Sequence, residues 1–297
     1  MAQATLTQPI AGRVARRTSR WSAYWALYTL TLRQHLHGKR WLVMSLLFLL
    51  PVGLAALVRW TARDVPTEML EFTLGMMFVP QALLPIAALL YASGIIQDDE
   101  EEQTITYLLL RPISKWAIYT IKLLAAMTTT AALVVLFTAL MYVAIYLGTS
   151  AAWGEVVVRW LKASSIHALS IVTYCSLFGL MSLMTKRILV AGILYIAVVE
   201  GLLANLPFGI RWITVIYYAR MLAYRTMSFQ VPRPSGRSED FAAHAWQLNP
   251  IADPQLLDHP QISTCIATLV IASVVFTAIA AWLCSQREFH VKTPEKE

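Results

Sequence analysis

Five consecutive carboxylates, Asp98–Glu102, form the densest group of charged side chains in this sequence. Ile105, Leu108 and Leu109 follow at helical spacing, and Pro112 then disfavours helix at the residue before it. Carboxylates in this position can stabilise the positive end of a helix dipole, or they can bind a basic surface on another protein. The residues alone leave a docking element and a solvated acidic helix start equally open.

Three polar side chains occur inside strongly hydrophobic stretches, namely His167, Glu200 and Asn205. An ionisable side chain at membrane depth is costly and usually faces a cavity or a partner. Glu200 is therefore a candidate for lining a translocation path or for pairing with Arg211, and the alternative is a protonated or interface-reaching side chain. His167 and Asn205 are further candidates for lining the path. Their surroundings in the sequence favour a His167 that is hydrogen-bonded between helices and an Asn205 that ends a helix before Pro207.

Metal binding and catalysis find little support in the sequence. His35 and His37 would not share one face of a helix, and His244 and His259 show no recognised ligand spacing. No arrangement of serine, cysteine or carboxylate residues suggests an enzyme. We predict no metal site, no cofactor bound by this chain and no catalytic residue. The cysteines lie within hydrophobic runs and lack C-x-x-C spacing: Cys175, Cys265 and Cys284.

The elements that carry these residues follow from hydropathy. The chain has 297 residues, of which 58% are hydrophobic and 14% charged, and its mean hydropathy is +0.58. Its hydrophobic runs have the length of about 20 residues that a membrane-spanning helix needs. The sequence therefore predicts an all-α polytopic membrane protein with six spans, approximately Trp41–Val58, Phe72–Ile96, Ala117–Leu147, Leu161–Met184, Ile188–Leu206 and Ile262–Cys284.

The basic residues around these spans fix the expected orientation. They gather on the side that the positive-inside rule makes cytoplasmic, so the net charge of +7 indicates loops at a membrane rather than a nucleic-acid partner. We predict both termini in the cytoplasm and the bacterial inner membrane as the location. The residues concerned are Arg13, Arg16, Arg17, Arg20, Arg33, Lys39, Arg40, Lys186, Arg187, Arg287, Lys292 and Lys296.

The predicted organisation has three parts. Residues 1–40 form a cytoplasmic N-terminus, 41–284 a single transmembrane domain, and 285–297 a tail. The N-terminal part contains aromatic residues at helical spacing, which predicts an amphipathic helix at the membrane interface or, alternatively, a helix packed on the protein. The long loop 207–261 is expected outside, beginning with a re-entrant or surface-lying helix pair.

The run EEEQTITYLLLRPISKWAIYTIKLLA resembles the permease subunits of type-2 ABC exporters. These carry acidic residues, a threonine, a leucine-rich stretch, and then proline, a hydrophobic residue, serine and a basic residue. Gln103 departs from the glycine that is more frequent in the family. The N-terminal run LRQHLHGKRWLVMSLLFLLPVGL is also similar to the family's entry into its first span. The matching residues are Glu101, Glu102, Thr104, Leu108, Leu109, Pro112, Ile113, Ser114, Lys115 and Lys122.

The resemblance implies that residues 97–116 contain a coupling helix that docks on a cytoplasmic ABC ATPase. The chain contains no G-x-x-x-x-G-K-[ST] motif, so ATP and Mg²⁺ are expected on that partner. Ser114 is expected to cap the helix that follows. The expected coupling residues are Asp98, Asp99, Glu100, Glu101, Glu102, Thr104, Leu108, Leu109, Arg111, Pro112, Ser114 and Lys115.

The expected assembly contains two ATPase subunits and two permease subunits, as a homodimer or a heterodimer in membrane lipid. Alternating access would move the substrate, with the second and fifth spans lining the path. Two alternatives remain open: an ion-coupled secondary transporter that uses Glu200 and His167, and a scaffold or assembly factor without transport activity.

Overall fold

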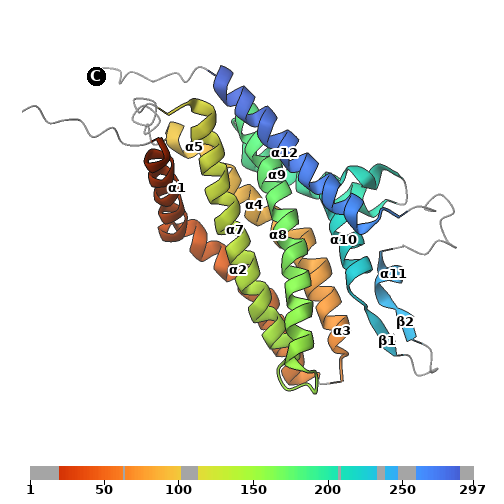
Figure 1. Cartoon of the computed structure of the whole chain (residues 1–297). Coiled ribbons are helices and arrows are strands. Elements are labelled where there is room, and N and C mark those ends of the chain that lie inside the picture. Colours follow the sequence, from red (N-terminus) through yellow and green to blue (C-terminus); the bar gives the residue numbers. More distant parts are fainter. Residues whose placement is uncertain are drawn as a thin grey trace, which may run out of the picture.

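The fold is an elongated helical bundle, and the computed structural model describes residues 20–62, 64–101, 113–206, 209–232, 238–246 and 259–287 (Figure 1). One end carries α1, α5 and the C-terminal end of α12, and we call it the α5 end. The other carries α3, β1 and β2, and we call it the hairpin end. The elements are α1 (Arg20–His37), α2 (Lys39–Thr61), α3 (Thr67–Leu70), η1 (Glu71–Leu83), α4 (Leu84–Ala92), α5 (Gly94–Glu101), α7 (Lys115–Tyr146), α8 (Trp153–Met184), α9 (Ile188–Tyr195), η2 (Ile196–Leu202), η3 (Leu203–Asn205), η4 (Gly209–Ile213), α10 (Val215–Thr226), β1 (Gln230–Pro232), β2 (Ser238–Asp240), α11 (Phe241–Ala245) and α12 (Ile262–Gln286).

Six helical segments of the described chain are long and hydrophobic enough to cross a membrane. This confirms the predicted all-α polytopic fold, to which the structure adds one short hairpin formed by β1 and β2. The segments are Lys39–Thr61, Thr67–Asp98, Lys115–Tyr146, Trp153–Met184, Ile188–Asn205 and Ile262–Gln286.

The fourth span begins earlier than its hydropathy indicates. α8 starts at Trp153, whereas the predicted span starts at Leu161. The prediction began too late because Glu155 and Arg159 lower the hydropathy of the first turns of the helix. The second span also departs from a regular α-helix, since Glu71–Leu83 follows a π-helical course with Pro80 inside it. π-helical turns are rare in proteins and frequently occur at functional sites.

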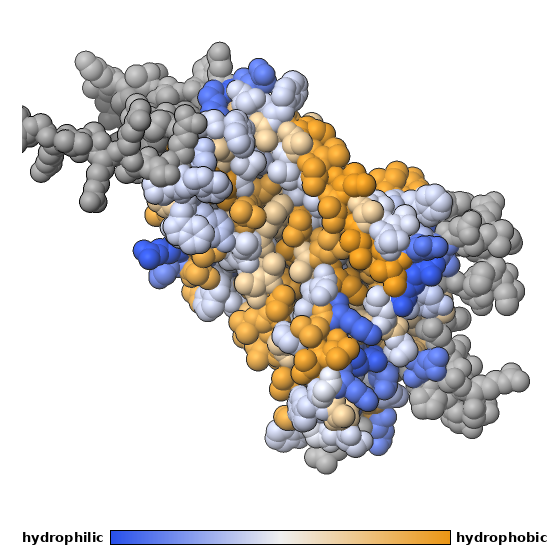
Figure 2. Space-filling model, in the orientation of Figure 1, coloured by the Kyte–Doolittle hydropathy of each residue, from blue (hydrophilic) through white to orange (hydrophobic). Residues whose placement is uncertain are grey.

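The spans differ greatly in how much of their surface the chain itself buries. α8 packs against α12, α7, α4 and α10, and 67% of its most hydrophobic stretch is buried. The corresponding share is only 17% in α12 and 22% in the span Ile188–Asn205. Hydrophobic residues cover much of the face shown in Figure 2, as expected for surfaces that meet lipid or another subunit.

The N-terminal helix packs on the protein, which is one of the two arrangements considered from the sequence. α1 packs on α7, where the Tyr28 hydroxyl donates to Thr128 Oγ1 at 3.0 Å, and Leu27 on the same side is buried. Trp21 and Trp25 remain 81% and 67% exposed. The exposed tryptophans suit a membrane interface, so the interfacial position of α1 remains a prediction.

The segment before the last span contains more structure than the predicted helix pair. The 3₁₀ helix η4 and the partly buried helix α10 lead into the antiparallel hairpin, in which Val231 pairs with Glu239. Phe72 of η1 contacts the rings of Phe229, Phe241 and Trp246, with centroid distances of 5.3, 5.2 and 4.8 Å. These aromatic contacts hold the residues on either side of the β1–β2 hairpin against the second span. The predicted re-entry of this segment into the membrane remains a prediction.

Candidate functional site

The predicted coupling segment is described only at its two ends. α5 includes Asp98, Asp99, Glu100 and Glu101, and the chain is described again from Ile113. The predicted coupling helix therefore remains a prediction. The predicted coupling residues that lie outside the described residues are Glu102, Thr104, Leu108, Leu109, Arg111 and Pro112.

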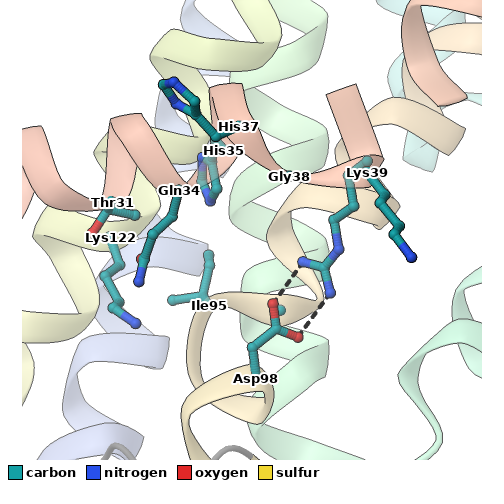
Figure 3. Close-up of a pocket in the computed structure, with 11 residues that line it drawn as sticks. Thr31, Gln34, His35, His37, Gly38, Lys39, Ile95, Asp98 and Lys122 are labelled. Atoms are coloured by element: carbon teal, nitrogen blue, oxygen red, sulfur yellow. Dashed lines mark hydrogen bonds and ion pairs between the residues drawn. The ribbon is translucent and has the colours of Figure 1, made fainter. Parts of the chain in front are cut away.

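The start of the segment is attached to two other parts of the bundle. Gln97 Nε2 donates to the backbone oxygens of Ser182 and Thr185, at 3.2 and 2.8 Å, at the C-terminal end of α8. Asp98 forms an ion pair with Arg40 at the start of α2, with nitrogen–oxygen distances of 2.8 and 2.7 Å (Figure 3). The first carboxylate of the acidic run thus has a partner within its own chain.

The end of the segment is attached to the last span. Lys115 Nζ donates to the backbone oxygen of Arg287 at 2.9 Å, and Cys284 Sγ lies 3.6 Å from the backbone oxygen of Lys115. Ser114 occupies the N-cap position of α7, as predicted, but its hydroxyl makes no capping hydrogen bond. Its backbone oxygen accepts from the amide of Ile118 at 3.1 Å. A force on the start of the segment would therefore reach α2 and α8 directly, and a force on its other end would reach α12.

Glu200 is fully buried, and its hydrogen-bond partners belong to the same chain. The side chain therefore does not extend to the surface of the protein, as the interface-reaching alternative required. Its carboxylate accepts the amides of Val215 and Ile216, both at 3.1 Å, and the hydroxyl of Tyr195 at 2.9 Å. The two amides are the first of α10, so Glu200 supplies the acceptors that a helix start needs. Arg211, its predicted partner, lies over the ring of Tyr217, with its Cζ atom 5.5 Å from the centroid.

Asn205 and His167 occupy the kinds of position expected from the sequence. Asn205 is the last residue of η3, and its side-chain oxygen accepts from Arg220 Nη1 at 3.0 Å. His167 is fully buried, with Nε2 3.1 Å from the backbone oxygen of Gly75 and Nδ1 3.3 Å from Thr138 Oγ1. The carbonyl partner assigns the proton to Nε2, so that Nδ1 accepts from the threonine. His167 therefore joins the second, third and fourth spans.

A buried charged cluster that the sequence analysis missed lies around Glu71. This side chain is fully buried and accepts hydrogen bonds from the hydroxyls of Tyr142, at 2.6 Å, and Tyr146, at 2.9 Å. Arg159 donates to Glu71 Oε2 from Nε at 2.8 Å and from Nη2 at 2.5 Å, and its Nε also lies 3.1 Å from Oε1. Arg159 Nη2 also donates to the backbone oxygen of Ser228 at 3.1 Å. The cluster joins three spans and the segment before β1.

One signal in the sequence points toward this cluster. Tyr142 and Tyr146 are four residues apart, so they lie on one face of a helix and can approach the same acceptor. Glu71 and Arg159 fall at or beyond the predicted ends of their spans, where charged residues are expected to be solvated. Their pairing depends on the packing of α8 against η1, which one sequence does not reveal.

Six potential spans define a polytopic membrane protein. A family model described as ABC-2 family transporter protein matches residues 36–202, more than half of the chain. This chain belongs to that family of ABC transporter permeases. No curated protein matches it.

Family membership makes the chain a membrane component of a transporter, not itself a catalyst, and implies partnership with an ABC ATPase subunit. The matched region contains Glu71, His167, Glu200 and residues 97–116, and it ends before η3.

Proposed function

We propose that this chain is the permease subunit of an ABC transporter and moves its substrate by alternating access. A separate cytoplasmic ATPase, in two copies, would bind ATP and Mg²⁺ and dock on residues 97–116. The observation that carries the proposal is the attachment of both described ends of this segment. Gln97 holds the end of α8, and Lys115 contacts the end of α12.

The mechanical argument follows from these attachments. Closure of two ATPase subunits is a rigid-body movement, and it reaches the spans only through elements that move as one piece. Asp98 adds a third attachment through Arg40 at the start of α2. Displacement of the segment would therefore move the first, fourth and sixth spans together, while the Glu71 cluster holds the hairpin end.

The proposed assembly contains two permease subunits, identical or homologous, in the bacterial inner membrane with both termini in the cytoplasm. The large exposed hydrophobic surfaces of α9 and α12 support a second subunit and surrounding lipid as partners. Lys39, Arg40, Lys186 and Arg287 all lie near the α5 end, which supports placing that end in the cytoplasm.

The decisive experiment separates the acidic residues by their partners. The chain is co-expressed with a candidate ABC ATPase, and co-purification and ATPase stimulation are measured. One variant replaces Asp99–Glu102 with the corresponding amides and keeps Asp98, and its counterpart carries only Asp98→Asn. We expect the first variant to lose at least about tenfold in ATPase affinity, because charge-assisted contacts are lost. The second should lose less, since Asp98 already pairs with Arg40.

Unchanged co-purification and unchanged ATPase stimulation in the Asp99–Glu102 variant would reject docking through these carboxylates. Transport in vesicles that lack the ATPase, driven by a proton gradient, would favour the ion-coupled alternative instead. The positions of Glu200 and His167 disfavour an ion-coupled transporter, because both side chains are buried and hydrogen-bonded within the chain.

A further inference from the structure

A polar cavity of about 570 Å³ lies at the α5 end, between α1, the start of α2, α5 and α7 (Figure 3). Its lining includes Gln34 and His35 of α1, Lys39 and Arg40 of α2, and Lys122 of α7. α1 ends at His37 and α2 begins at Lys39, so Gly38 alone separates the two helices beside the cavity. The cavity is therefore built where the N-terminal helix meets the first span.

The described lining is electropositive. It carries three cationic side chains, Lys39, Arg40 and Lys122, against one carboxylate, Asp98. Burial, together with the positive charges of Arg40 and Lys122, lowers the pKa of His35 to about 4, although Asp98 acts in the opposite direction. His35 is therefore neutral near pH 7, and the positive charge of the described lining comes from its lysine and arginine side chains. Such a cavity suits a ligand with at least one negative charge.

The start of α2 adds to this preference for anions. The N-cap residue Gly38 has no side chain to bond the first amides of the helix, and it also lines the cavity. The first amides of a helix, together with its dipole, favour phosphate groups. Gly94 lines the same cavity, and a β-carbon there would overlap Arg40 Nη1 and Asp98 Oδ2. The absence of a side chain at Gly94 thus makes room for the ion pair of Arg40 and Asp98 beside the cavity.

The surroundings of the cavity indicate where the phosphate group comes from. Just after the start of α2, Leu42, Val43 and Leu46 are 62%, 57% and 73% exposed. On α1, Trp21 and Trp25 are exposed as well. Exposed hydrophobic residues on the same two helices as a basic cavity fit a molecule that has acyl chains and an anionic head. Basic pockets between helices at the membrane surface bind such head groups.

We propose that this cavity binds the phosphate group of an anionic phospholipid, with the acyl chains lying along the exposed side of α2. The phosphate would interact with Lys39, Arg40 and Lys122 and would share Arg40 with Asp98. Bound lipid would therefore bear on the first residue of the acidic run. The site goes beyond the proposed transport function and needs no ATPase.

The test uses the purified full-length chain in neutral detergent without any ATPase, so its outcome is independent of the proposed coupling. Thermal unfolding is followed while phosphatidylglycerol, phosphatidylcholine or inorganic phosphate is added. Three variants are compared: Lys39→Gln, Arg40→Gln and the control Lys186→Gln. Lys186 is an exposed lysine outside the cavity, next to the end of α8, and its substitution removes the same charge.

We expect phosphatidylglycerol to raise the unfolding temperature of the wild type and of Lys186→Gln, and phosphatidylcholine to do so far less. The two cavity variants should need about tenfold more phosphatidylglycerol for the same effect, because each lacks a charged phosphate partner. Native mass spectrometry of the wild type gives a second readout, in which phosphatidylglycerol should remain bound in preference to phosphatidylcholine. That readout does not depend on the stability of any variant.

Three results would overturn the proposal. The first is equal stabilisation by both phospholipids together with equal retention in the mass spectra. The second is an equal loss of affinity in Lys186→Gln and in the cavity variants. The third is an Arg40-dependent stabilisation by inorganic phosphate that phosphatidylglycerol does not increase, which would assign the cavity to a soluble phosphate compound.

Discussion

Arg159 reaches across from the fourth span to Glu71 of the second, donating to Oε2 at 2.8 and 2.5 Å and to Oε1 at 3.1 Å. The two residues are 88 positions apart in the chain. Glu71 is fully buried, whereas 22% of the Arg159 side chain remains exposed. The pair therefore sits at the edge of the core and fixes how the second and fourth spans meet at the hairpin end.

Removing one partner of this pair should be strongly destabilising. Glu71→Gln leaves the guanidinium of Arg159 without its carboxylate, and Arg159→Gln leaves a buried carboxylate with only two hydroxyl donors. We expect each single variant to lose about 3–5 kcal/mol of unfolding free energy. The double variant should lose less than the sum of the two. Denaturant or thermal unfolding in detergent provides the measurement.

The matched control for the Glu71 variants is Asp64→Asn, which removes an exposed carboxylate just before the second span. Its effect should stay within about 0.5 kcal/mol. Additive losses in the double variant would show that Glu71 and Arg159 do not act as a pair.

Glu200→Gln should affect folding more than transport. The carboxylate accepts the amide of Val215 on one oxygen and that of Ile216 on the other, and glutamine replaces one of these oxygens with an NH₂ donor that faces an N–H. Leaving a buried amide unpaired costs about 1–3 kcal/mol. The unfolding temperature should fall, whereas Glu155→Gln, at an exposed position early in α8, should leave it unchanged. A loss of transport at wild-type stability would instead return Glu200 to the translocation path.

His35 should make the stability depend on pH. Burial and the charges of Arg40 and Lys122 lower its pKa from 6.5 to about 4, so between these values the unfolded chain binds the proton and the folded chain does not. Stability should therefore decrease as the pH falls from 6.5 toward 4. His35→Gln should show a shallower decrease than the wild type in thermal unfolding across this range. Equal slopes in the wild type and in His35→Gln would contradict the assignment.

Gly192 on α9 allows the fifth span to approach α4. A β-carbon at this position would overlap the side chain of Leu89, which is only 4% exposed. Gly192→Ala should cost about 1–3 kcal/mol through overpacking, and Leu89→Val in the same protein should recover part of the loss. Gly53→Ala in α2 meets no atom within 4 Å and should be neutral or slightly stabilising. Thermal unfolding of the four proteins decides the question, and a missing rescue would argue against this contact.

The spans could be predicted because hydropathy depends on each stretch of sequence alone. Runs such as Val43–Leu50 are hydrophobic wherever they pack, so the six spans emerged at nearly their observed positions. The first turns of α8 did not, because Arg159 is favourable there only when Glu71 lies opposite. The β1–β2 hairpin was missed for a similar reason, since the aromatic contacts of Phe72 come from parts of the chain far away in sequence.

The candidate site likewise has features that the sequence could predict and features that it could not. The helix end at Asn205 and the interhelical role of His167 follow from local spacing and from the cost of a buried polar group. The partners of Asp98 and Glu200 are set by tertiary packing, which places Arg40 beside α5 and the start of α10 beside η2. A single sequence contains no signal for these distant pairs.

The π-helical course of Glu71–Leu83 has a consequence for how the length of the chain can change. In a regular α-helix, deleting one residue rotates everything beyond it by about 100° and turns a buried face outward. A π-helical stretch already holds more residues per turn, so a deletion there can be absorbed by the return of one wide turn to α geometry. Glu71 would keep its partners and α4 its packing on α8. A one-residue deletion between Gly75 and Leu83 should therefore leave the protein folded, whereas a one-residue deletion within α7 should unfold it.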